Sequence, residues 1–345
     1  MKVNFGIAVT IISGLLFLSS CNEKENDKVI DISSVDLTLD IHRYDRIFFE
    51  ADTLKLLSSL ESIRAKDSTF FDFYTIQMMN FGAIDDTLQP VLAGLNHFFT
   101  NPYVQGLYDT VQNHYPDNTI FEQELTDAMR HFNYYFPEKE IPEIYTTITE
   151  FSYNAASYDS TYLIFGLDMY LGKDYMYYTS FDFPLYMINR FSPEFLVPNG
   201  MEVMYNLYFG PDMMAETDAL LHAMIENGKK LYFLECMMPL KERNLLIGYT
   251  PEQLAWCEQE EDEIWRFYNE HDLFYSKNYM EHKKHVNDGP FTAGMPDGAP
   301  GNVGSWVGWQ IVNQYMKNAD GMISLTQLLD TDAETIMTKS KYKPK

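Results

Sequence analysis

The sequence predicts a mostly α-helical protein of the α+β class that carries one small antiparallel sheet. Apolar residues recur at helical spacing over most of the chain, and only residues 144–151 and 160–168 read as strands, being rich in Ile, Tyr, Phe and Thr. The chain has 345 residues, of which 46% are hydrophobic and 15% aromatic, so we expect a large packed core rather than disorder. This length suits two domains or one large one.

The charge balance limits the classes of partner. Lys and Arg number 25 against 50 Asp and Glu, which gives a formal net charge of −25. A chain this acidic repels phosphate backbones, so the sequence argues against nucleic-acid binding.

The first twenty residues predict a signal peptide. Lys2 is followed by an apolar run over residues 5–18, which is too short to span a bilayer as a helix. The run ends in Leu18-Ser19-Ser20-Cys21, which resembles the lipobox of bacterial lipoproteins. The resemblance implies a lipid anchor on the Cys21 thiol, and an ordinary secretory signal with a chance cysteine is the alternative. Residues 21–35 are polar without periodicity, so we expect a lipidated flexible tether.

Two regions are expected to follow the tether. Residues 36–142 predict a helical N-terminal region, with helices at 52–64, 70–81, 90–99, 102–114 and 121–135. Residues 143–345 then combine the two strands, expected to pair as an antiparallel hairpin around a loop at 154–159, with core helices. These helices are predicted at 213–236, from Pro251 behind a Thr250/Gln253 capping box, and at 302–317.

Histidines and cysteines offer little chemistry. His282 and His285 flank Lys283 and Lys284, and two cations disfavour a metal, so we expect an exposed helix end. Cys236 and Cys257 lie on apolar helix stripes and are expected to be buried core thiols, although a disulfide between them stays open. The sequence indicates no catalytic residue, no metal ligand and no cofactor.

Three glycines inside helices predict close helix packing. Gly228 interrupts the helix at 213–236, where glycine costs about 1 kcal/mol relative to alanine, so another backbone should approach it. Gly304 and Gly308 share one face of the helix at 302–317, beside Trp306 and Trp309. We expect this face to form a buried helix–helix seam, and a partner-binding surface is the alternative.

Several segments together resemble the GldB family of gliding motility-associated lipoproteins. The carriers are the lipobox and five further segments: 42–49 (HRYDRIFF), 166–172 (GLDMYLG), 228–233 (GKKLYF), 249–252 (YTPE) and 300–312 (PGNVGSWVGWQIV). The resemblance covers nearly the whole mature chain. It implies an envelope lipoprotein that is required for surface gliding in motile relatives.

A more distant resemblance links the family to predicted zinc-dependent proteases of the zincin type. Glu226-Asn227-Gly228 is similar to their second motif, while Tyr186 and Arg190 stand where the two histidines of the first motif would be. Arginine cannot lose its proton to bind zinc, so the resemblance implies a degenerate zincin-like scaffold without metal. Tyr186, Arg190 and Glu226 would then line a vestigial cleft.

These observations favour a non-catalytic, lipid-anchored protein of the cell envelope, in the outer membrane and facing either the periplasm or the surface. It would act by binding other envelope proteins, and its membrane contact would be the anchor at Cys21. The alternative is an envelope hydrolase of peptidase type that uses Glu226 or other carboxylates on the same scaffold.

Overall fold

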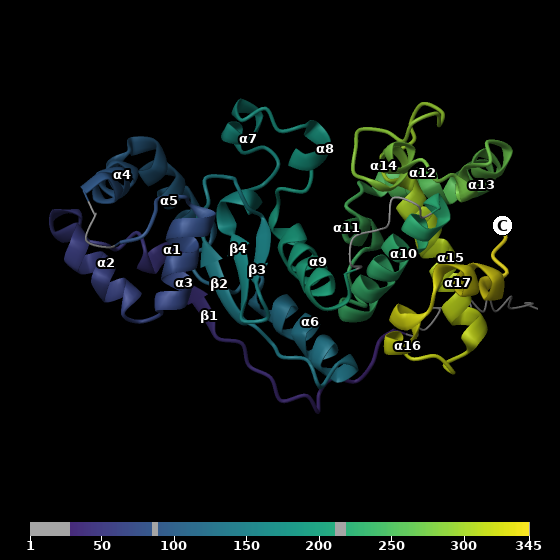
Figure 1. Ribbon diagram of the computed structural model, residues 1–345, viewed down its shortest axis with the longest axis horizontal. Helices are drawn as coiled ribbons and strands as arrows, with labels where there is room; N and C mark the ends of the chain where they lie inside the picture. The colour runs from purple at the N-terminus through teal and green to yellow at the C-terminus, as the bar shows by residue number, and fades with distance from the viewer. Residues whose placement is uncertain (1–27, 85–88, 211–218, 345) are drawn as a thin grey trace, which may run out of the picture.

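A computed structural model describes residues 28–84, 89–210 and 219–344 of the chain (Figure 1). The predicted signal peptide, Cys21 and the first residues of the helix expected from Met213 lie outside these described residues. The mostly helical class with one small sheet is confirmed. Figure 1 shows an elongated molecule in which the N-terminal helices lie at one end, the sheet and α9 (Leu196–Phe209) near the middle, and the C-terminal helices at the other end.

The described helices follow the predicted order, with additional short ones. Before and beside the sheet stand α1 (Tyr44–Ile47), α2 (Leu56–Arg64), α3 (Ser68–Asp72), α4 (Gln89–Thr100), α5 (Pro102–His114) and α6 (Glu122–Tyr135). After the sheet, in addition to α9, come α7 (Met176–Ser180), α8 (Leu185–Ile188), α10 (Leu220–Met237), α11 (Arg243–Ile247), α12 (Pro251–Gln259), α13 (Glu261–Glu270), α14 (Tyr279–Val286), α15 (Val303–Ala319), α16 (Leu325–Asp330) and α17 (Ala333–Ser340). The capping box predicted at Thr250 and Gln253 begins α12.

The helix predicted over residues 70–81 is present, but it changes type after Asp72 and ends at Met78. After α3 the chain widens into a π-helix, Phe73–Met78, and Asn80 then takes a positive φ of 53°. The wider turn accompanies complete burial of three large rings, those of Phe70, Phe71 and Tyr74. Packing of these rings has therefore overridden the regular helical spacing.

The sheet is mixed, and the predicted antiparallel pairing of its two main strands is wrong. Its strands are β1 (Ile41–Arg43), β2 (Glu143–Thr147), β3 (Ala155–Tyr158) and β4 (Tyr162–Gly166), in the order β1-β2-β4-β3. β2 runs parallel to both β1 and β4, and only β3 and β4 form an antiparallel hairpin. The sequence Ala-Ala-Ser-Tyr of β3 has only one strong strand former, so sequence patterns predict a loop there.

Alternation along the strands places the sheet between two apolar cores. On β2 and β4, Tyr145, Tyr162 and Ile164 join the aromatic cluster built by α1–α5. Ile144, Leu163 and Phe165 point to the opposite face and join the larger core formed with α6, α9, α10 and α15. Because successive strand residues face opposite sides, this short sheet connects the two ends of the molecule.

The segment His42-Arg43-Tyr44-Asp45 has a structural role, because Asp45 joins several elements by hydrogen bonds. Asp45 is 1% exposed and accepts both Arg43 Nε at 2.9 Å and Arg43 Nη2 at 2.8 Å. It also accepts the amide of Gln112 on α5 at 2.8 Å and the hydroxyl of Thr146 on β2. A buried carboxylate needs such a complete set of donors, and here they join β1, α1, α5 and β2.

A second buried carboxylate, Asp168, holds the turn that follows β2. Its oxygens accept the backbone N–H of Thr149 at 3.0 Å and of Phe151 at 2.6 Å. Glu150 and Phe151 both have positive φ, at 51° and 64°, a conformation that is strained for residues with a side chain. Burial raises the pKa of Asp168 to about 6 despite these hydrogen bonds, so the folded chain keeps this proton to a higher pH than the unfolded chain does.

We expect Asp168→Asn to destabilise the protein by about 1–3 kcal/mol, because its amide NH₂ must face one of the two backbone N–H donors. The pH dependence gives a second readout. The unfolded chain releases the Asp168 proton near pH 4 and the folded chain near pH 6, so parental stability falls by up to about 3 kcal/mol across that interval. The deficit of the variant in thermal melts should therefore be larger at pH 4 than at pH 7. An equal deficit at both pH values would contradict this prediction.

Lys28 of the predicted tether and the residues that follow the tether contact the folded chain. Residues 28–40, which we call the strap, run along the lower side of Figure 1 from the C-terminal helices to β1. Arg130 Nη2 donates to the carbonyl of Leu37 at 3.1 Å, and Leu37 and Leu39 pack against the larger core. At the start of the strap, Lys28 forms an ion pair with Glu235 of α10.

Candidate functional site

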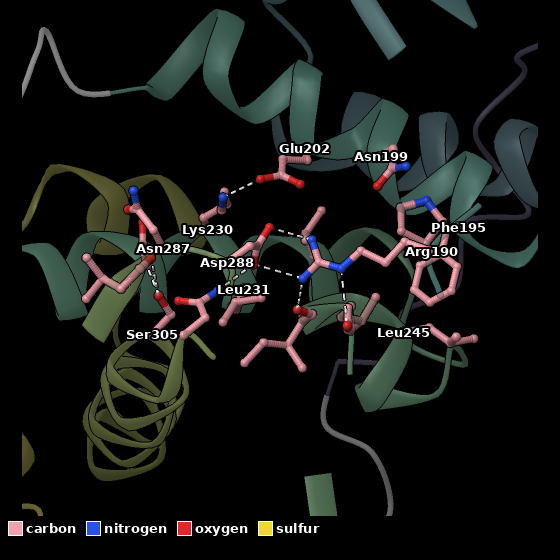
Figure 2. Close-up of a pocket in the computed structure, with 18 of the residues that line it drawn as sticks. Arg190, Phe195, Asn199, Glu202, Lys230, Leu231, Leu245, Asn287, Asp288 and Ser305 are labelled. Carbon is pink, nitrogen blue, oxygen red and sulfur yellow. Dashed lines mark hydrogen bonds and ion pairs between the residues drawn. The ribbon is translucent and has the colours of Figure 1, made fainter. Parts of the chain in front are cut away.

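A cavity of about 490 Å³ lies between α8 and α9 on one side and α10, α11 and the segment joining α14 to α15 on the other (Figure 2). Apolar side chains, among them Leu231, Leu234 and Leu245, form part of its wall. The remaining wall is polar and comes from Tyr186, Arg190, Asn199, Glu202, Asn227, Lys230, Asn287, Asp288, Asn302 and Ser305. A volume of this size suits a few side chains of a partner or a small ligand.

Arg190, two residues after α8, ties the two sides of the cavity together. Its Nη1 and Nη2 donate to the two carboxylate oxygens of Asp288 at 2.7 and 2.9 Å, as Figure 2 shows. Its Nε and Nη2 also donate to the carbonyls of Gly248 and Ile247 at 3.1 and 2.9 Å. Gly248 has a φ of +78°, and a Cβ there would lie 2.1 Å from the guanidinium carbon. Glycine at the end of α11 therefore leaves the space that Arg190 occupies.

A second ion pair joins Lys230 of α10 to Glu202 of α9 across the cavity. Burial opposes ionisation of Glu202, but the Lys230 ammonium and the Arg190 guanidinium hold its pKa below the usual value. Glu202 is thus a stable carboxylate near neutral pH and a weak proton acceptor.

Amide and hydroxyl groups complete the polar wall. The Asn227 side chain donates to Ser305 Oγ at 2.7 Å and to the Val286 carbonyl at 3.2 Å. Asn302 donates to Asp288 Oδ1 at 3.2 Å, and its own Oδ1 is buried without a hydrogen-bond partner. With Asn199 and Asn287, four carboxamides line this cavity. A carboxamide can both donate and accept hydrogen bonds.

The glycine seam predicted from the sequence is confirmed, and it positions this wall. A Cβ on Gly228 would lie 2.3 Å from the carbonyl carbon of Gly308, and one on Gly304 would lie 2.8 Å from the carbonyl oxygen of His285. The backbones of α10 and α15 are therefore in direct contact. This contact brings Asn227, one residue before Gly228, within hydrogen-bond distance of Ser305 on α15.

The structure brings two of the three predicted cleft residues to this cavity. Tyr186 and Arg190 line it, but Glu226 is not among the lining residues. Glu226 instead pairs with Lys229 at 2.8 Å and lies 3.8 Å from His222, while its neighbour Asn227 faces the cavity.

Sequence reasoning did not single out Glu202, Lys230, Asp288, Asn302 or Ser305 as site residues. Lys230, Asn302 and Ser305 stand inside two of the segments that carry the family resemblance, so a signal for them was present. Glu202 and Asp288 had none, because their partners come from distant parts of the chain.

The expectation of an exposed helix end at His282 and His285 is wrong. Both are buried, with 2% and 1% of their surface exposed, whereas Lys283 and Lys284 point to solvent. His282 Nε2 lies 2.7 Å from the carbonyl of Ser276, and His285 Nδ1 lies 3.4 Å from the hydroxyl of Tyr268. Residues three apart share one helix face, and here that face packs into the core.

The two cysteines are buried and unpaired, as expected for core thiols. Burial raises the pKa of both thiols, that of Cys236 to about 12. Neither thiol is a nucleophile at neutral pH.

No three His, Cys, Asp or Glu side chains in the described ranges converge as a metal site requires. Within the same residues, no helix combines the length and the hydropathy needed to cross a bilayer.

Comparisons with known proteins identify the family. No curated protein and no solved structure matches the chain significantly. A family model described as gliding motility protein GldB matches residues 25–344, which is nearly the whole chain. The match includes every described helix and strand and every residue that lines the cavity. The chain belongs to the GldB family of gliding motility proteins.

Proposed function

We propose that this protein is a lipid-anchored component of the cell envelope that binds a segment of a partner protein in the Arg190–Glu202 cavity and catalyses no reaction there. The observation that carries the proposal is the pairing of charges. Arg190 is neutralised by Asp288, and Lys230 by Glu202, whose pKa lies below its usual value. General acid catalysis needs a group that holds a proton near neutral pH, and Glu202 does not.

The chemistry of the wall fits a peptide segment. Carboxamides such as those of Asn199 and Asn287 match the donors and acceptors of a peptide backbone. Leu231, Leu234 and Leu245 offer apolar surface for one or two side chains. Such a combination, apolar with a few fixed polar groups, is typical of binding sites.

Filling the cavity tests this proposal. We expect Asn287→Trp, at an exposed lining residue, to block partner binding while the thermal melting temperature stays unchanged. A photo-crosslinking residue at Met187, on the cavity wall, should form adducts in intact envelopes that disappear in the Asn287→Trp background. Met280→Trp on α14, outside the cavity lining, is the matched control and should keep the adducts. Adducts that persist in Asn287→Trp would contradict binding in the cavity.

The non-catalytic part of the proposal has its own test. Purified protein should not hydrolyse a panel of envelope peptides. Hydrolysis that is lost in Glu202→Gln or Glu226→Gln would instead establish the peptidase-type alternative.

Anchoring is tested at Cys21. The lipobox resemblance and the family support acylation of its thiol, and buried acyl chains contribute about 0.8 kcal/mol per methylene. We expect Cys21→Ser to leave the membrane fraction after processing, or to accumulate as unprocessed precursor, in fractionated cells. A fully processed Cys21→Ser variant that stays on the membrane would contradict the lipid anchor.

A further inference from the structure

Lys28 fixes the point at which the strap begins on the folded chain. Its ammonium pairs with Glu235, donates to Asn313 Oδ1 at 2.9 Å and lies 4.3 Å from the ring centre of Tyr232. The side chain is only 17% exposed. Contacts with both α10 and α15 locate this point between two helices that belong to the core.

The point lies toward the C-terminal ends of these two helices. A Cβ on Gly304 would meet Met224, one on Gly308 would meet Met224 and Ile225, and Trp309 Nε1 donates to Glu235 at 2.9 Å. The contacts advance along both helices in the same direction, so α10 and α15 run parallel and end on the same side. Glu235 is two residues from the end of α10.

One apolar side chain is exposed in each of the three segments that flank this point. Val29 follows Lys28 directly and is 51% exposed. Leu240, in the turn after α10, is 86% exposed, and Met322, in the turn after α15, is 78% exposed. Exposed apolar side chains such as these can enter the interfacial region of a bilayer that lies against them.

The short chain between Cys21 and Lys28 brings the bilayer to this end of the helix pair. Seven residues lead from Cys21 to Lys28, and an extended chain of that length reaches at most about 25 Å. An acyl anchor at Cys21 therefore holds the ends of α10 and α15 close to the bilayer. This step rests on the lipid anchor of the proposed function.

We propose that the protein sits on its own membrane in a fixed orientation, with Val29, Leu240 and Met322 against the phospholipid surface and the cavity facing away from it. The rest of the strap does not lie on the bilayer, because Asp31, Asp36 and Asp40 are exposed and acidic. The start of the strap, at Lys28, is on the side of the molecule opposite α8 and α14 (Figure 1), and the lining residues Met187 and Asn287 lie in α8 and directly after α14. A partner would thus reach the cavity from the aqueous side.

Depth-dependent quenching on the acylated full chain tests this orientation. Single cysteines at Leu240 and Met322, and at the exposed control positions Leu185 and Met280 on α8 and α14, would carry a fluorophore. The native Cys236 and Cys257 are buried with raised pKa values and should resist labelling. The protein would be reconstituted in phosphatidylethanolamine–phosphatidylglycerol vesicles that carry a nitroxide on the headgroup.

We expect quenching at positions 240 and 322 to be at least about threefold stronger than at 185 and 280. Lys28→Ala removes the ion pair with Glu235 but keeps the lipid anchor. It should reduce this difference in quenching by at least about half. Equal quenching at all four positions, or a difference that Lys28→Ala leaves intact, would overturn the proposal. Vesicle flotation distinguishes failure of the lipid anchor from failure of the proposed orientation. Protein that does not float lacks the anchor, and protein that floats without a quenching difference lacks only the orientation.

Discussion

Gly308→Leu should unfold the protein at ordinary temperatures or lower its melting temperature more than any other single substitution in α15. A Cβ at this position would lie 1.6 Å from the carbonyl oxygen of Met224 and 2.3 Å from its carbonyl carbon. Overpacking typically costs about 1–3 kcal/mol when side chains can adjust, but here the obstacle is the backbone of α10. We therefore expect a loss above about 3 kcal/mol, measured by thermal and urea denaturation beside the parent.

Gly106→Ala is the matched control, because Gly106 also stands inside a helix, α5. A Cβ there meets nothing within 4 Å, so the substitution should be neutral or stabilise by about 0.5–1 kcal/mol. An unchanged melting temperature in Gly308→Leu would mean that α10 and α15 do not touch at this glycine. In that case the surface reading of the Gly304/Gly308 face would return.

The seam was predictable because glycine inside a helix is a local signal with few explanations. Gly228, Gly304 and Gly308 each cost helix stability, and a close backbone approach is what offsets that cost. The helices at 102–114 and 121–135 were equally accessible to sequence reasoning, since their apolar spacing is local and the first of them also has a local cap at Asn101.

The topology of the sheet could not be predicted from such local signals in the sequence. Between β2 and its parallel partner β4 the chain forms β3, which runs antiparallel to β4 and whose Ala-Ala-Ser-Tyr sequence carries little strand signal. β1 lies about a hundred residues before its partner β2 and has only three residues. Such pairings are decided by burial on both faces of the sheet, which no local pattern reports.

Some of the residues that line the cavity could be predicted from the sequence, and others could not. Arg190 came from a resemblance, and Lys230 and Ser305 stand in segments that the resemblance also contains. The ion partners Glu202 and Asp288 lie 28 and 98 residues from Lys230 and Arg190 respectively. Only the fold reveals such long-range pairs. The buried face of His282 and His285 was missed because two flanking lysines dominated the local charge pattern.

Glu235 is the most connected carboxylate near the end of α10. It is 8% exposed and accepts Lys28, Arg243 Nε at 3.0 Å and the indole N–H of Trp309 at 2.9 Å. The Arg243 guanidinium also lies 4.1 Å from the ring centre of Trp309. One side chain therefore joins the strap, α10, α11 and α15.

Glu235→Ala should destabilise the protein by about 2–4 kcal/mol, because it leaves two cations and a buried indole N–H without their shared acceptor. The value lies below that of a fully buried pair, since Arg243 is 37% exposed and can turn to water. Glu258→Ala is the matched control: Glu258 also lies near Arg243, at 3.9 Å, but is 53% exposed, so its removal should cost less than about 0.5 kcal/mol. Urea denaturation of the two variants beside the parent measures both values. Similar small losses in both would show that Glu235 is an ordinary surface pair and that the strap is held elsewhere.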